Sequence, residues 1–327
     1  MTRNARVTKE QVTQYSSRVI RRFVPTLVAL VFFTMFVFVS SVGIQNQNGQ
    51  TNSAQQAGAP DWKAVELALG KAGSMQPGNV YKVSLPRSDL KITVAGVELK
   101  PALALGSWVA FKKTGDMTMV MGDLVLTEDE VTAVMTRLQE GGVEETALHN
   151  HVLHESPRVM YMHIHAMGEG VKIAKAIHDA LALTKTPFAS AASNPNQALD
   201  IDTKQLDQIL RLSGKENGGV YQFSVARAEK IADRGMEVPP AMGVATALNF
   251  QPTGGGKAAI TGDFVLIGSE VNPVIKALRA NGIEVTALHS HMLNEAPRLF
   301  FMHFWANDDA QKLARSLRAA VDLTNSK

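Results

Sequence analysis

Eight of the nine histidines lie in a segment that occurs twice in the chain. The first copy, residues 146–166, reads TALHNHVLHESPRVMYMHIHA, and the second, residues 286–306, reads TALHSHMLNEAPRLFFMHFWA. Imidazole is the commonest protein ligand for transition metals and the side chain best suited to proton transfer near neutral pH. We therefore expect the chemistry of this protein in the duplicated segment.

The segment reads as a β-hairpin, in which side chains alternate between two faces. His149 and His151 then share one face of the first strand, and His163 and His165 share one face of the returning strand. The residues between them on the returning strand are strongly apolar and should meet the core. If His151 stands opposite His163 and His149 opposite His165, their Cβ atoms are about 5 Å apart. Imidazoles at that spacing can converge on one ion.

The second copy keeps three of these four positions and carries Trp305 in place of His165. Its candidate metal ligands are His289, His291 and His303. The pattern favours a mononuclear transition-metal site in each hairpin, with zinc the first choice and iron, copper or manganese as alternatives. Zinc would support hydrolysis through an activated water, and the other metals would support redox chemistry.

A glutamate and an arginine also recur at the turn of each hairpin, as Glu155 and Arg158 in the first copy and as Glu295 and Arg298 in the second. Each glutamate is a candidate ligand or general base, and each arginine a candidate for binding an anionic substrate. Three interpretations stay open: a metal site, metal-free catalysis by histidine, and histidines that are only half-buried polar residues. A glutamate–arginine pair that simply pins the turn is an equal alternative.

Two further pairs of residues recur outside the histidine segment. Asp123 and Asp263 each follow a glycine near the start of an apolar strand, and a role in a turn is expected for them. Arg87 and Arg227 each follow a strand, and a surface position is expected for both.

The N-terminal residues 1–45 have the character of a targeting segment, because a basic stretch precedes an apolar run long enough to span a bilayer. This predicts a signal peptide or a signal-anchor, with the body exported to the periplasm or the extracytoplasmic face of the membrane. Contact with the membrane is expected only through this segment. This segment has a net charge of +5, whereas the whole chain has a net charge of +3, so the rest of the chain has a net charge of −2. A body with this charge gives no argument for nucleic-acid binding. The absence of cysteine excludes disulfides and thiolate metal sites.

The body divides into two homologous units separated by polar, small-residue stretches. We predict a flexible linker at 46–60, a first repeat at 61–185, a second linker at 186–200 and a second repeat at 201–327. Strands and amphipathic helices alternate in the same order in both repeats. This predicts an α+β fold, in which each domain is a mostly antiparallel sheet with helices packed on one face and a histidine-bearing hairpin.

With the motifs GVY, MxGDLVL and TALHNHxLxExPR, the chain resembles the LppY/LpqO family of exported bacterial proteins over residues 61–325. The resemblance implies export and a domain of unknown function present in two copies, and it brings no established activity. The chain departs from the family's lipoproteins because it has no cysteine. His149, His151 and Glu155 also fit the first half of a cupin metal motif, but the second half is missing and the predicted helices do not suit an all-β barrel.

Two classes of function follow from these observations. The first is transition-metal binding, either with or without hydrolytic or redox catalysis. The second is a non-enzymatic envelope module whose histidines are structural or bind an anionic ligand, with a small molecule or an envelope component as its partner.

Overall fold

The structure is a computed structural model that describes residues 61–189 and 198–326. The predicted targeting segment 1–45, the linker 46–60 and the central part of the linker 186–200 lie outside the described residues. Within the described ranges, none of the helices combines the length and the apolar character needed to cross a membrane.

The first repeat is a six-stranded sheet in the order β1-β2-β5-β6-β9-β7, and every neighbouring pair of strands is antiparallel. Its strands are β1 (Ser74–Gln76), β2 (Val80–Pro86), β5 (Gly106–Thr114), β6 (Met117–Thr127), β7 (Glu144–His149) and β9 (Val159–Gly168). Its helices are α1 (Trp62–Leu69), the short α2 (Pro101–Ala104), α3 (Val131–Glu140) and α4 (Gly170–Leu181). A small three-stranded sheet joins β3 (Thr93–Val94), β4 (Val97–Glu98) and β8 (Glu155–Ser156).

The second repeat has the same topology, with a sheet in the order β10-β11-β14-β15-β18-β16. Its strands are β10 (Lys215–Asn217), β11 (Val220–Ala226), β14 (Ala245–Gly254), β15 (Lys257–Ile267), β16 (Glu284–His289) and β18 (Leu299–Asp309). Its helices are α5 (Thr203–Leu210), the short 3-10 helix η1 (Pro240–Met242), α6 (Gly268–Ala280) and α7 (Ala310–Val321). The small sheet here joins β12 (Ala232–Asp233), β13 (Met236–Glu237) and β17 (Glu295–Ala296). The predicted fold class, two homologous α+β domains, is confirmed.

One face of each sheet carries the helices, as the alternation of apolar residues predicts. On β9, Met162, Ile164 and Ala166 join a buried cluster with residues of α1, α3 and α4. Burial of each large apolar side chain stabilises the fold by roughly 1.5–3 kcal/mol. In contrast, Leu148 in β7 and its counterpart Leu288 remain 42% and 46% exposed.

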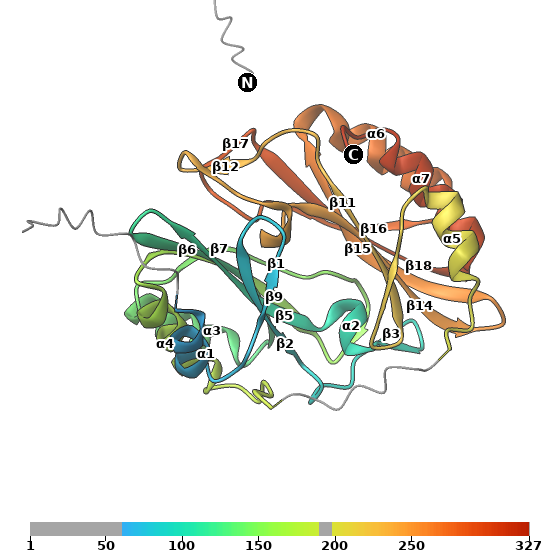
Figure 1. The fold of residues 1–327 in the computed structure, drawn as a ribbon. Helices are drawn as coiled ribbons and strands as arrows, with labels where there is room; N and C mark the ends of the chain where they lie inside the picture. The colour runs from blue at the N-terminus through green and yellow to red at the C-terminus, as the bar shows by residue number, and fades with distance from the viewer. Residues whose placement is uncertain (1–60, 190–197, 327) are drawn as a thin grey trace, which may run out of the picture. The chain divides into compact units, whose positions relative to one another are not determined.

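The opposite faces of the two sheets pack against each other. One buried cluster combines Met119 and Met121 of β6 with Val265 of β15 and Phe301 of β18. A second combines Val125 and Tyr161 of the first repeat with Trp305 of the second. Both repeats belong to one compact unit, with helices on the outer side of each sheet (Figure 1). The histidine face is thereby directed toward the other repeat.

The register of the first hairpin differs from the prediction. His149 stands opposite Tyr161 and Ala147 opposite His163, with a bulge between Glu145 and Ala147. The predicted pairs of His151 with His163 and His149 with His165 were therefore wrong. The reason is that β7 ends at His149 and is not joined to β9 by a simple turn. The connection between them contains β8, which pairs with β3 in the small sheet.

The prediction that Arg87 and Arg227 lie on the surface was also wrong. Arg87 is 0% exposed, and its guanidinium donates to the carboxylates of Asp89 and Glu130 and to the carbonyl of Val125. Arg227 makes the equivalent set of hydrogen bonds in the second repeat. Arg87 therefore connects the end of β6 to the start of α3, and Arg227 connects the end of β15 to the start of α6.

Candidate metal centre between the two repeats

The two histidine hairpins meet each other. The Thr146 hydroxyl donates to the His291 carbonyl at 2.6 Å, and the Thr286 hydroxyl donates to the His151 carbonyl at 2.5 Å. These reciprocal bonds join the threonine of each TALH motif to the other copy's H-x-H motif. The sequence left open whether the hairpins form one site or two, and the structure brings them together.

Six histidines stack in three pairs at this contact, and each pair takes one ring from each repeat. The ring centroids are 3.5 Å apart for His149 and His289, 3.7 Å for His163 and His291, and 3.9 Å for His151 and His303. Tyr161 stacks on His151, and Phe301 stacks on His291 in the same way. The His149–His289 and His163–His291 rings are stacked with interplanar angles of 23° and 22°, and the His151–His303 pair is tilted by 31°.

Two aspartates join the histidines. Asp123 on β6 stands opposite His163 on β9, and Asp263 on β15 stands opposite His303 on β18. Cross-strand neighbours lie on the same face of a sheet, so each carboxylate is directed into the cluster. Turn roles had been expected for both aspartates, but both lie within strands, where Asp123 is buried and Asp263 is partly buried.

The side chains form four groups in which the potential ligand atoms all lie within 4.8 Å of one another. The groups are His149 with His163, His289 and His291; Asp263 with His289, His291 and His303; His149 with His151 and His303; and Asp123 with His151 and His163. Imidazole nitrogen and carboxylate oxygen are common ligands of zinc, iron and manganese. Several sets of residues in the cluster could therefore hold a metal ion.

The tautomer of three of these histidines follows from their hydrogen bonds. The Nδ1 atoms of His149, His289 and His303 lie 3.1, 3.5 and 2.7 Å from backbone carbonyl oxygens. A carbonyl can only accept, so Nδ1 donates the hydrogen and Nε2 presents a lone pair. Metal-ligating histidines show this same arrangement, with one nitrogen bonded to a carbonyl and the other to the metal.

The Nε2 atoms of all six histidines are buried and, among the described residues, have no hydrogen-bond partner. One carboxylate oxygen each of Asp123 and Asp263 shares this condition. Buried polar groups in folded proteins are nearly always partnered. A cluster of converging acceptors lacks a donor, and a cation would satisfy several of them at once.

Burial also determines the charge state of the cluster. It lowers the pKa of His149 to about 4 and of His289 to about 3. It also lowers the pKa of His163 well below the usual histidine range, and that of His303 likewise. The imidazoles are therefore neutral at pH 7, which is the form that binds metals. Burial raises the pKa of Asp123 to about 8, against the opposing effect of the nearby Lys82.

The predicted ligand His165 lies outside the four groups. Its Nε2 is 3.1 Å from an oxygen of Asp233 in the second repeat, and its Nδ1 is 3.8 Å from Glu144. In the second repeat the equivalent Trp305 is buried in the contact between the sheets. This position therefore contributes a polar contact in one repeat and an apolar contact in the other.

The turn residues predicted as catalytic lie apart from the histidine groups. Glu295 is buried, accepts from the Leu299 backbone N–H at 3.0 Å and lies 3.2 Å from Arg298. That arrangement matches the alternative in which the pair pins the turn. In the first repeat, Arg158 is exposed and lies 3.7 Å from Glu128.

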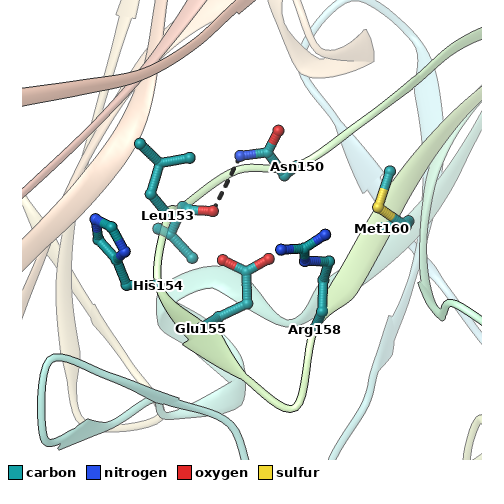
Figure 2. Close-up of a pocket in the computed structure, with 7 residues that line it drawn as sticks. Asn150, Leu153, His154, Glu155, Arg158 and Met160 are labelled. Carbon is teal, nitrogen blue, oxygen red and sulfur yellow. Dashed lines mark hydrogen bonds between the residues drawn. The ribbon is translucent and has the colours of Figure 1, made fainter.

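Glu155 and Arg158 line a pocket of about 280 Å³ on the outer side of the first hairpin. Figure 2 shows their side chains next to each other, and His154 and Asn150 also line the pocket. Asn150 donates its side-chain N–H to the Val152 carbonyl at 3.0 Å, which shapes the loop. The pocket contains none of the six clustered histidines, so it is a separate feature of the first repeat.

Sequence reasoning missed the two aspartates as members of the site. Their signal was a carboxylate after glycine inside an otherwise apolar strand, at the same place in both repeats. Such a residue is costly to bury without a partner. The parity of the strand could have placed it beside His163, because that histidine lies on the adjacent strand.

The fold and the cluster define a class of protein in which a duplicated α+β domain forms a histidine and aspartate centre between its two copies. The family model described as Domain of Unknown Function (DUF1259) matches residues 63–183 and 204–323. The chain belongs to this family and contains two copies of the family's domain. No curated protein matches the chain.

Several solved structures have a weak similarity to this chain. A trimeric bacterial microcompartment shell protein, PduB, is 12% identical with a TM-score of 0.21, over 78% of this chain and 91% of that chain. EtuB from Clostridium kluyveri is 11% identical with a TM-score of 0.21, over 77% and 90%. The ethanolamine utilization protein EutL from Leptotrichia buccalis is 8% identical with a TM-score of 0.19, over 72% and 93%. A likeness at this level does not bear on function.

Proposed function

We propose that this protein binds transition metal in the buried centre that its two repeats build together. The observation that carries the proposal is the convergence of Nε2 atoms whose lone pairs have no protein partner in the described structure. The carbonyl oxygens at Nδ1 of His149, His289 and His303 orient these lone pairs toward the cluster. The hairpins therefore present the centre in a form ready for a cation.

The energetic cost of the cluster supports a bound cation. A buried polar group without a partner costs about 1–3 kcal/mol, so the six Nε2 atoms together cost roughly 6–18 kcal/mol. That range is as large as the whole stability of a typical domain, about 5–15 kcal/mol. Metal coordination satisfies these acceptors and converts the cost into binding free energy that stabilises the fold.

The donor set restricts the choice of metal. It contains imidazoles and carboxylates, and the chain has no cysteine to supply a thiolate. Zinc, ferrous iron, manganese and cupric copper suit such donors, whereas cuprous copper prefers sulfur ligands. We place zinc first because the groups have three or four members, the ligand number of most zinc sites.

The proposal places metal binding itself before catalysis. His163, His291 and His303 are all buried, and the pocket beside Glu155 and Arg158 does not include them. A hydrolytic or redox reaction on a large substrate needs a path to the metal. A binding role needs only the enclosed ligands.

The direct test is metal analysis of the full chain prepared without a polyhistidine tag. After removal of metal, incubation with zinc and dialysis, we expect at least about one equivalent of zinc per chain, since structural sites of this kind bind zinc tightly. His303→Ala should lose metal. His154→Ala is the matched control, because His154 is 76% exposed and outside the four groups. A content below roughly 0.2 equivalents for the unaltered chain would refute metal binding.

The second candidate function is a ligand-binding module that uses the pocket beside the first hairpin. The observation in its favour is that Arg158, His154 and Asn150 line a pocket together with Glu155 and apolar side chains, in which the Arg158 guanidinium offers a partner for a small anionic ligand. Calorimetric titration with inorganic phosphate and with acetate, using Arg158→Ala as the comparison, tests this. Binding that depends on Arg158 in metal-free protein would favour it.

We also propose that the body is exported through residues 1–45. The basic stretch followed by an apolar run in the sequence supports this. Fusion of the first 60 residues to an enzyme that is active only outside the cytoplasm tests the proposal, with a charged substitution in the apolar run as the control.

A further inference from the structure

We infer that the centre holds two metal ions, one on each repeat's own set of histidines and aspartate. The inference rests on the proposed function and specifies its stoichiometry. In the second repeat the set is Asp263, His289, His291 and His303. In the first repeat it is Asp123, His151 and His163, and His149 is the equivalent of His289.

The grouping of ligand atoms carries the first step. Of the four groups, the two that contain an aspartate share no residue with each other. They are also equivalent by the duplication, because Asp123, His151 and His163 recur at an offset of 140 residues as Asp263, His291 and His303. The two groups without an aspartate both use His149, so they cannot be filled together as separate sites.

The distances within these sets carry the second step. Asp123 Oδ2 lies 3.7 Å from His151 Nε2 and 3.9 Å from His163 Nε2. These separations are too long for hydrogen bonds. Two ligands of a tetrahedral zinc ion, each about 2.0–2.1 Å from the metal, are about 3.4 Å apart. The pairs are thus separated as co-ligands of one ion are, after a shift of a few tenths of an ångström.

The second repeat shows the same spacing, with Asp263 Oδ2 at 3.3 Å from His291 Nε2. Its four donors form one complete group, which equals the ligand number of a tetrahedral zinc site. A single tetrahedral ion would leave half of the eight donors in the cluster without a partner. Two ions on the sets that contain an aspartate use seven of the eight, and His149, the equivalent of His289, is the remaining donor of the first repeat.

One difference between the repeats predicts the order of loading. Lys82 lies over the ring of Trp108, which is the cross-strand neighbour of Asp123, and the position equivalent to Lys82 is occupied by Gln222 in the second repeat. The Lys82 ammonium donates to the Ala241 carbonyl at 3.1 Å and lies 4.0 Å from the Trp108 ring centroid. A fixed cation beside one carboxylate opposes the binding of a second cation there. The second repeat's set should therefore bind its ion more tightly.

The test is a titration of the metal-free full chain with zinc, followed by metal analysis after dialysis. We expect two ions per chain, one ion for Asp123→Asn and one for Asp263→Asn, with the weaker step lost in Asp123→Asn. No ion in the unaltered chain overturns the proposed function together with this inference. One ion overturns the inference alone. Loss of both ions, or of neither, in the single variants overturns the assignment of one ion to each repeat.

A measurement without substitutions covers the case in which a variant does not fold. Cupric ion is loaded into the unaltered chain at two equivalents, and its electron paramagnetic resonance signal is integrated. Two ions in adjoining sets couple magnetically, so the integrated signal should fall well below that of two isolated ions. A full, uncoupled signal contradicts the two-ion centre even when two ions are bound.

Discussion

Replacing His163 by leucine should separate a metal ligand from a structural histidine, because the two roles predict opposite signs. His163 is 4% exposed, and its Nε2 has no partner among the described residues. An oxygen of Asp123 lies 3.9 Å from this Nε2 atom. Its ring stacks on His291 at 3.7 Å. Leucine has nearly the same volume and brings no polar atom.

The expected change in the metal-free protein follows from these contacts. Removal of one unsatisfied buried acceptor gains about 1–3 kcal/mol. Loss of the stacked ring costs roughly 0.5–1.5 kcal/mol. The metal-free His163→Leu variant should therefore be as stable as the unaltered chain, or more stable by up to about 2 kcal/mol. With zinc at a thousand times its dissociation constant, the unaltered chain gains about 4 kcal/mol. The variant should lose most of that gain.

The assay is urea unfolding followed by circular dichroism, with and without zinc. His178→Leu is the matched control, because the Nδ1 of His178 bonds to the Leu69 carbonyl at 2.9 Å, away from the cluster. The control should lose about 1 kcal/mol or more equally in both conditions. If metal-free His163→Leu is less stable than the unaltered chain by more than about 2 kcal/mol, the ring has a structural role and the reasoning is refuted.

Four other variants test the architecture around the centre. Arg227→Met leaves buried carboxylates unpaired and should cost about 3–5 kcal/mol in urea unfolding. In the unaltered chain, burial raises the pKa of Glu229, but hydrogen bonds from Arg227 outweigh this effect and lower that pKa from 4.5 to about 2. Glu229 therefore stabilises the fold above pH 4.5 and loses that effect as the pH falls toward 2. Glu229→Gln should flatten the acid side of a profile of unfolding free energy measured between these pH values. The double variant Thr146→Val, Thr286→Val removes both hydroxyl hydrogen bonds between the hairpins. It should weaken zinc binding, measured by competition with a chelator. An unchanged zinc affinity would show that packing alone holds the hairpins together. Gly262→Ala would place a Cβ 1.9 Å from the Ala247 carbonyl oxygen, so β15 must move away from β14; a melting temperature within about 2 °C of the unaltered chain would contradict this.

The histidine hairpin shows what parity can predict and where it stops. Alternation correctly placed Met162 and Ile164 among the helices, because side-chain direction along a strand is a local property of the backbone. The cross-strand partners of His149 and His151 were predicted wrongly. Register depends on where the connection goes, and here the connection adds β8 to a separate small sheet.

Charged residues show the same limit. Arg87 follows a strand and resembles a surface residue in sequence, yet it is buried because Asp89 and Glu130 satisfy its guanidinium. Glu130 is 43 positions away in the chain. Composition cannot reveal such a pairing, since the benefit of burying a charge depends on partners that only the fold brings close.

The sequence by itself determined the duplication, the α+β class and the concentration of imidazole in one repeated segment, because these depend on residue type and local period. The tertiary structure decided that the two segments form one centre. His149 and His289 are 140 positions apart and stack at 3.5 Å, and the aspartates join them from neighbouring strands. The physical reason is the packing of one sheet on the other: each repeat has a second apolar face, and its burial against the other repeat brings their ligands together.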